Sequence, residues 1–104
     1  MAFPENKLVE LPQNPAGTVV VGVGTTVEVR QMMEKGYDFT RGAGAGFTAV
    51  LEGSVRGQNW TTIVNLNASG QGAISGHYNL VRANVSVGGA LGTGTELYAS
   101  GKII

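Results

Sequence analysis

Few side chains in this sequence could carry out acid–base or metal chemistry, and those few are scattered. His77 is the only histidine, there is no cysteine, and Asp38 is the only aspartate. Zinc sites and catalytic triads each need several such groups together, so we expect His77 to lie in a surface turn. Glu52 and Glu96 fall on predicted strands, but the sequence does not define the separation that a hydrolytic carboxylate pair requires. The sequence therefore predicts no catalytic residue, no metal ligand and no cofactor site, and we expect a protein that is not an enzyme.

Two glycine-rich segments could form contact loops. The run Gly42-Ala-Gly-Ala-Gly46 resembles a phosphate-binding loop only in composition, because no Gly-Lys-Ser/Thr and no helix follow it. Residues 88–94 form a second loop of this kind. Glycine lets a backbone lie flat on another surface, and it also lets a loop move. Both interpretations stay open.

Trp60 is the only tryptophan, and it follows the predicted turn Gly57-Gln-Asn. An indole can stack on a sugar. At the start of a return strand, however, it more often joins the core, since it buries about 150–250 Å². We therefore expect Trp60 in the core.

The composition excludes several partners. The chain has 104 residues, seven basic and seven acidic, and only 13% are charged. Nothing in this balance suggests a nucleic-acid or anionic membrane surface. We see no signal peptide and no membrane-spanning apolar run, so we expect synthesis in the cytoplasm. A surface with so few charged residues is typical of a protein that is covered by neighbouring proteins.

The first 16 residues differ from the rest. They hold all three prolines together with the apolar Leu8, Val9 and Leu11. Proline lacks a donor and pushes the residue before it to extended geometry, which favours an extended arm. We expect such an arm to lie along its own body or along a neighbouring subunit, although a partly ordered terminus fits as well. Residues 1–16 are thus predicted as the arm and residues 17–104 as one domain.

In the remaining sequence apolar and polar residues alternate, which is typical of β-strands. Apolar residues recur at every second position in segments 17–33, 47–55, 60–66, 81–87 and 96–104. We expect a turn at Val23-Gly-Thr-Thr and loops from residue 37 to 46 and from 67 to 76. About seven short strands with frequent turns predict an all-β fold, an antiparallel β-sandwich of jelly-roll-like form.

Two segments of the sequence resemble segments of known protein families. Leu51-Glu-Gly-Ser-Val-Arg-Gly-Gln-Asn-Trp-Thr-Thr-Ile and Tyr78-Asn-Leu-Val-Arg-Ala-Asn-Val-Ser-Val resemble the strand block of discoidin-like jelly rolls. They are still more similar to short β-sandwich proteins of tailed-phage virions, which carry Ser-x-Asp-Gly-x-x-Trp followed by Tyr-x-Tyr-Val-Arg-x-x-Val. Arg56 replaces the aspartate of this pattern and Leu80 its second aromatic residue.

The resemblance implies a virion structural protein, specifically a capsid decoration (cement) protein. Its expected partners are the major capsid protein and further copies of itself, with a trimer favoured. Its expected location is the capsid surface. We expect the arm and the glycine loops to make the contacts, through Phe3, Leu8, Val9, Leu11, Gly42, Gly44, Gly46 and Leu91. The alternatives are a head–tail connector or tail component of the virion, and a carbohydrate-binding module.

Overall fold

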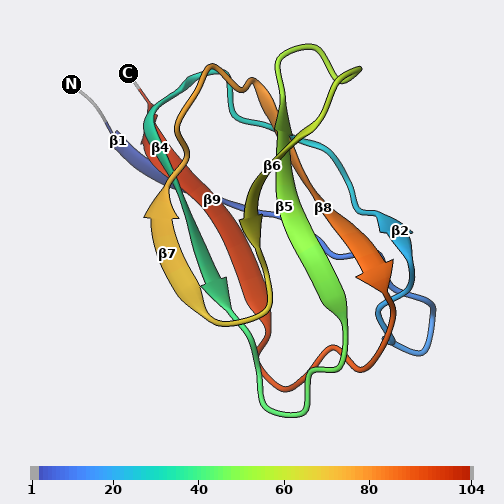
Figure 1. Ribbon diagram of the computed structural model, residues 1–104. Helices are drawn as coiled ribbons and strands as arrows, with labels where there is room; N and C mark the ends of the chain where they lie inside the picture. The colour runs from blue at the N-terminus through green and yellow to red at the C-terminus, as the bar shows by residue number, and fades with distance from the viewer. Residues whose placement is uncertain (1–2, 104) are drawn as a thin grey trace.

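The computed structural model describes residues 3–103, without the side chain of Phe3, and the only regular elements in this range are β-strands (Figure 1). The predicted all-β antiparallel sandwich is confirmed, with nine strands where about seven were expected. They are β1 (Phe3–Leu8), β2 (Gly22–Val23), β3 (Val27–Glu28), β4 (Met32–Thr40), β5 (Thr48–Ser54), β6 (Thr61–Asn65), β7 (Gly70–Ala73), β8 (Leu80–Val87) and β9 (Glu96–Ile103).

The strands form two sheets. One has the order β1-β9-β4-β7, and the other has the order β2-β8-β5-β6, with β3 also paired to β8. Gly22 pairs with Val85 and Val27 with Val81, so β2 and β3 run along β8 in the same direction. The turn predicted between them is therefore wrong, because the chain only breaks its pairing there and does not reverse.

With β2 and β3 counted as one interrupted strand, the topology is that of a jelly roll. The first strand pairs with the last, β1 with β9. The next pairs are β2/β3 with β8, β4 with β7, and β5 with β6. Successive pairs alternate between the two sheets, as in a long antiparallel ribbon that has been rolled up. The jelly-roll expectation is thereby confirmed.

The core lies between the sheets and follows the predicted alternation. On β8 the buried residues are Val81, Ala83 and Val85, each at most 1% exposed. Phe39 and Phe47 pack edge to face with their ring centroids 6.5 Å apart. The burial of these and the other core residues is the main favourable contribution to the stability of a small domain.

Two predicted loops contain strands. Residues 37–40 continue β4, and residues 70–73 form β7, which pairs with β4 through Gly36↔Ala73. All four residues of β7 are exposed, so no apolar alternation marks them in the sequence. Backbone pairing alone makes this segment a strand.

Trp60 is not in the core, contrary to the prediction. Leu51 pairs with Val64, but the next residue, Glu52, pairs with Thr62, so Ile63 is an extra residue in β6. Such a β-bulge breaks the two-residue period. Trp60 and Thr62 consequently leave the inward face, and Trp60 is only half-buried.

The predicted arm is extended and lies along its own chain. Residues 3–8 form β1 beside β9, and the Lys7 ammonium donates to the carbonyl of Glu28 in the other sheet at 2.9 Å. The chain then crosses from one sheet to the other. Val9 and Leu11 point inward there and are 2% and 8% exposed. The arm therefore closes one open side of the sandwich, which we call the seam.

Candidate functional site

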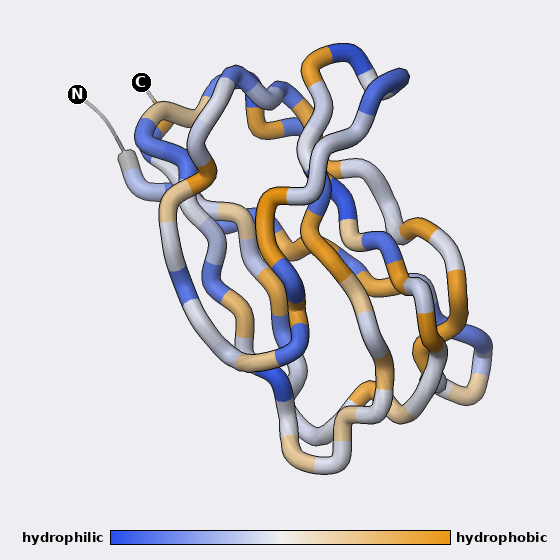
Figure 2. The backbone as a smooth tube through the Cα atoms, in the orientation of Figure 1, coloured by the Kyte–Doolittle hydropathy of each residue, from blue (hydrophilic) through white to orange (hydrophobic). Residues whose placement is uncertain are grey.

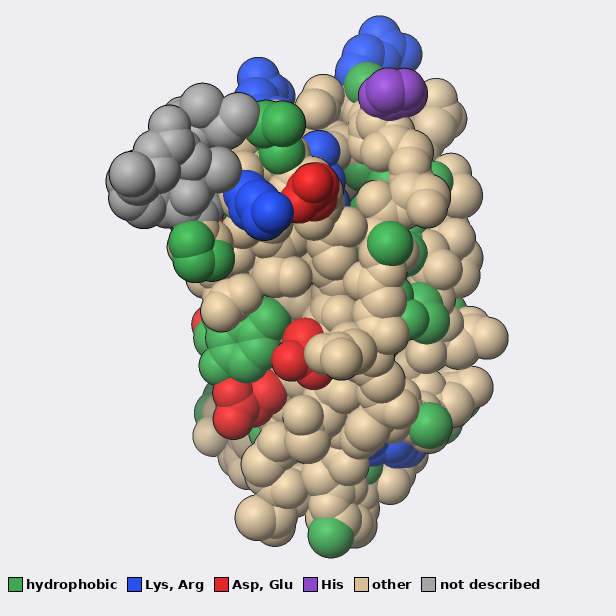
Figure 3. All heavy atoms as spheres, turned by 90° about the vertical axis from the view of Figure 1, so that its left-hand side faces the viewer, with side chains coloured by type: hydrophobic (Ala, Val, Ile, Leu, Met, Phe, Trp, Pro, Cys, Tyr) green, Lys and Arg blue, Asp and Glu red, His purple; other side chains and the backbone are tan. Residues whose placement is uncertain are grey.

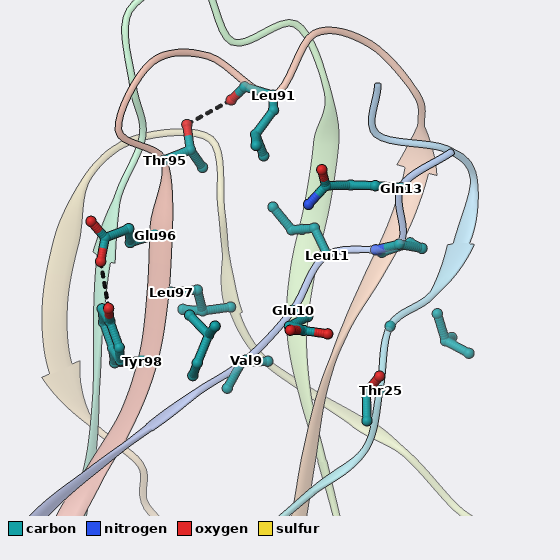
Figure 4. A pocket seen from close by; sticks show the side chains of 14 residues that line it. Val9, Glu10, Leu11, Gln13, Thr25, Leu91, Thr95, Glu96, Leu97 and Tyr98 are labelled. Atoms are coloured by element: carbon teal, nitrogen blue, oxygen red, sulfur yellow. Dashed lines mark hydrogen bonds between the residues drawn. The ribbon is translucent and has the colours of Figure 1, made fainter. Parts of the chain in front are cut away.

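A groove lies at the seam (Figure 4). It has a volume of about 600 Å³ and is open to solvent. The crossing arm, the break after β2, and the start of β9 contribute its walls. The lining residues are Leu8, Val9, Glu10, Leu11, Pro12, Gln13, Val23, Gly24, Thr25, Leu91, Thr95, Glu96, Leu97 and Tyr98.

Four of the predicted contact residues meet in this groove. Leu8, Val9 and Leu11 come from the arm, and Leu91 comes from the second glycine-rich loop. Leu8 is 49% exposed, whereas Val9 and Leu11 are buried. Only Leu8 among the three arm residues therefore offers much side-chain surface to a partner.

The other predicted contacts lie elsewhere. Gly42, Gly44 and Gly46 belong to the β4–β5 loop and do not line the groove. Phe3 begins β1, and its side chain lies outside the described part of the chain. No observation tests these residues as contacts, so they stay predictions.

The two glycine-rich loops pack against each other. A Cβ atom on Gly42 would lie 2.0 Å from the carbonyl oxygen of Thr93, a clash that only glycine avoids. The Gly46 amide donates to the Ala90 carbonyl at 2.9 Å, and Ala43 bridges to Thr93. Close approach of two backbones accounts for the glycines at these positions.

Thr95 fixes the loop that carries Leu91. Its hydroxyl donates to the Leu91 carbonyl at 2.6 Å and accepts from the Gly42 amide at 2.8 Å. One side chain thus joins both loops and holds Leu91 at the groove. Nothing in the sequence marks Thr95 for this role, because it is one of many polar residues in a glycine-rich segment.

Arg41 holds the β4–β5 loop from its other side. Its guanidinium donates to the carbonyls of Leu66 at 2.9 Å, Phe47 at 2.7 Å and Ala45 at 3.4 Å. It also lies 4.5 Å from the centroid of the Phe47 ring. A rigid fork of donors matches this set of acceptors, which a lysine could not.

The groove carries acidic and no basic side chains. Glu10 and Glu96 line it, and no lysine or arginine does. The Tyr98 hydroxyl donates to the Glu96 carboxylate. That hydrogen bond, followed by the carboxylate charge and desolvation, raises the pKa of Tyr98 above its usual value.

Apolar side chains are exposed next to the groove. Leu8, Val21 and Val23 are 49%, 67% and 47% exposed, and we call these three residues the edge patch. Residues 11–27 contain no charged side chain. The segment beside β8 is accordingly hydrophobic in Figure 2. Strand edges and patches without charges are common sites of association.

The residues first considered for chemistry do not come together. Glu52 lies on β5 and Glu96 on β9, in different sheets, and His77 is exposed. Asp38 pairs with Tyr98 across β4 and β9. Figure 3 shows the side of the molecule that carries this sheet, where both acidic and basic side chains are exposed. Residues 3–103 contain no group of three or more His, Cys, Asp or Glu placed to hold a metal ion. No helix in that range is long and apolar enough to cross a membrane.

The close backbone contact between Gly24 and Glu10, behind the groove, could not be predicted from the sequence either. A Cβ atom on Gly24 would lie 1.9 Å from the carbonyl oxygen of Glu10. The backbone of the crossing arm is thus in direct contact with the segment between β2 and β3. The glycine was visible in the sequence, but its distant backbone neighbour was not.

Comparison with known proteins identified no family model, no curated protein and no solved structure that matches this chain.

Proposed function

We propose that this protein is a structural component of a tailed-phage virion, a decoration protein that binds the outer surface of the capsid shell. The observation that carries the proposal is the edge patch beside the seam groove. It joins exposed apolar side chains to a chain segment without charges. Such a surface stabilises a protein–protein contact when it is covered.

The jelly-roll fold is compatible with this role, although folds of this kind serve many functions. Multivalency would strengthen the role, because many copies on one shell can each bind weakly and still brace it. Self-association would add to the stability of a small domain. The sequence resemblance over residues 51–63 and 78–87 points to the same class of protein.

Binding to shells tests the proposal. Under this proposal the gene belongs to a phage genome, and shells of the major capsid protein from that genome are mixed with the purified protein and sedimented. We expect the protein to sediment with the shells. We expect Leu8→Lys and Val21→Lys to reduce occupancy at least about tenfold, which corresponds to roughly 1.4 kcal/mol. Each change places a charge on the edge patch without entering the core.

Val55→Lys is the matched control. Val55 is 52% exposed and lies in the loop between β5 and β6, away from the groove. Failure of the unmodified protein to sediment with shells would remove the proposal. If Leu8→Lys, Val21→Lys and Val55→Lys all reduce shell occupancy equally, the edge patch is not the surface that binds the shell. Rings of six or twelve copies, in place of a trimer, would favour the connector or tail alternative.

A further inference from the structure

We propose that the outer face of the five-stranded sheet binds a neutral sugar, through a platform formed by Trp60, Arg82, Glu52 and Asn84. This inference is separate from shell binding and does not depend on it. It rests on the one tryptophan of the chain, which the bulge at Ile63 moves out of the core. The shell proposal assigns no role to this ring.

The four side chains come from three neighbouring strands or their ends. Glu52 of β5 and Arg82 of β8 are directly paired across the sheet. Their neighbours Leu51, Val81 and Ala83 are buried, so both side chains face outward. Trp60 directly precedes β6, and its ring centroid lies 3.8 Å from the guanidinium carbon of Arg82.

A hydrogen-bond network fixes the polar part of the platform. The Glu52 carboxylate accepts from Arg82 Nε at 3.0 Å and from Asn84 Nδ2 at 3.2 Å. Trp60 Nε1 donates to the Gly57 carbonyl at 3.2 Å, which orients the indole. A site whose side chains are already held in place loses little entropy when a ligand binds.

The platform retains free hydrogen-bonding capacity. Arg82 Nη1, Arg82 Nη2 and Asn84 Oδ1 make no hydrogen bond to a described residue, and none of them is a buried unsatisfied atom. They can therefore donate to and accept from hydroxyl groups of a ligand. Arg82 covers one face of the indole, so the opposite face and the edge of the ring are the apolar surface on which the C–H face of a pyranose can pack.

Charge favours a neutral ligand over an anion. Arg82 and Glu52 form an ion pair with side chains only 21% and 12% exposed, so their charges cancel locally. Two cross-strand partners of the network are uncharged: Thr62 lies opposite Glu52, and Val50 lies opposite Asn84. A phosphate or carboxylate would meet the Glu52 charge, whereas a sugar would not.

The fluorescence of Trp60 reports binding directly, because no other tryptophan is present. The free protein is titrated with methyl glycosides of glucose, galactose, mannose and N-acetylglucosamine, to about 50 mM. This range is well above the roughly millimolar dissociation constant expected of a single sugar ring. We expect at least one of them to change the emission of Trp60 and to receive saturation transfer in NMR. Inorganic phosphate serves as the anionic probe and should do neither.

Three platform variants and one control variant assign the effect to the platform. Trp60→Ala should abolish saturation transfer to the sugar, and Trp60→Phe should retain part of it. Asn84→Ala should weaken binding about tenfold or less, whereas Asn65→Ala, an exposed asparagine on the neighbouring strand, should leave it unchanged. Thermal unfolding followed by circular dichroism shows whether each variant is folded.

The proposal is overturned if none of the glycosides binds, if phosphate binds in their place, or if folded Trp60→Ala still receives full saturation transfer. It is likewise overturned if Asn65→Ala and Asn84→Ala lose binding equally. Shell sedimentation of the same preparations is scored separately, so a failure here leaves the decoration proposal untouched.

Discussion

Arg41→Met tests whether one side chain holds the loops that frame the groove. Methionine keeps much of the apolar stem but removes the guanidinium, which leaves the carbonyls of Leu66 and Phe47 without their donors. A hydrogen bond to a charged group contributes about 1.5–3 kcal/mol, and cation–π contact about 0.5–1 kcal/mol. Arg41 is half-buried, and water can replace part of what is lost. We therefore expect the free energy of unfolding to fall by about 2–4 kcal/mol, out of roughly 5–15 kcal/mol for a typical domain.

Urea unfolding measures this change, with Trp60 fluorescence and circular dichroism as probes. Arg30→Met is the control, because Arg30 pairs with Glu28 at the surface and its side chain is 56% exposed. Such pairs contribute about 0–1 kcal/mol. Arg41→Lys should resemble Arg41→Met more than the unmodified protein, since lysine lacks the fork of donors. If Arg41→Met lowers the free energy of unfolding no more than Arg30→Met does, Arg41 does not hold the loops in the way proposed.

Three further changes probe the seam. Gly24→Ala places a methyl group 1.9 Å from a backbone oxygen and should lower the free energy of unfolding by at least about 2 kcal/mol, whereas Gly70→Ala, which meets nothing within 4 Å, should cost far less. Thr95→Val removes one hydrogen bond between the two loops and one within the segment that carries Leu91, so urea unfolding should show a loss of about 1–3 kcal/mol. Glu96→Gln should lower the pKa of Tyr98 toward its usual value in an ultraviolet titration, and an unchanged titration would contradict the assigned cause. Because the folded state raises this pKa, the stabilisation by Glu96 is present below the unfolded pKa and is lost as the pH rises through the folded one.

The strands of this fold could be predicted wherever an apolar alternation reports a buried face. Segments such as β5 and β8 have one face in the core and one in solvent, so their sequence carries the pattern. β7 has no buried side chain, and its Gly-Gln-Gly-Ala sequence is that of a loop. Its partner β4 supplies the pairing, and a single segment cannot reveal its partner.

The groove was only partly predictable for a similar reason. Apolar residues in a proline-bearing arm indicated contact, and Leu8 and Leu91 do meet in the groove. The sequence could not show that Val9 and Leu11 serve the core of their own chain. Nor could it show that the carbonyl of Glu10 lies against Gly24, because that contact joins segments from opposite sheets.

The bulge at Ile63 explains the misplaced tryptophan and the origin of the platform together. Trp60, Thr62, Val64 and Leu66 share one face only if β6 keeps a two-residue period, and the extra residue breaks that period between Thr62 and Val64. The ring then lies over Arg82 on the outside of the sheet. One inserted residue therefore separates a core role from a surface role, and no propensity in the sequence marks where the insertion falls.

The two proposed surfaces meet at one register position, where Val23 of the edge patch pairs with Asn84 of the platform. The backbone of Trp60 lies at the opposite edge of the sheet, beside β6, and its ring reaches Arg82 of β8 but not β2. A partner that stops at β2 would therefore leave the indole uncovered. A partner that extends over the sheet face would cover Asn84 first. Comparing the emission of Trp60 in free and shell-bound protein distinguishes these geometries, because only the extended contact brings partner atoms to the platform.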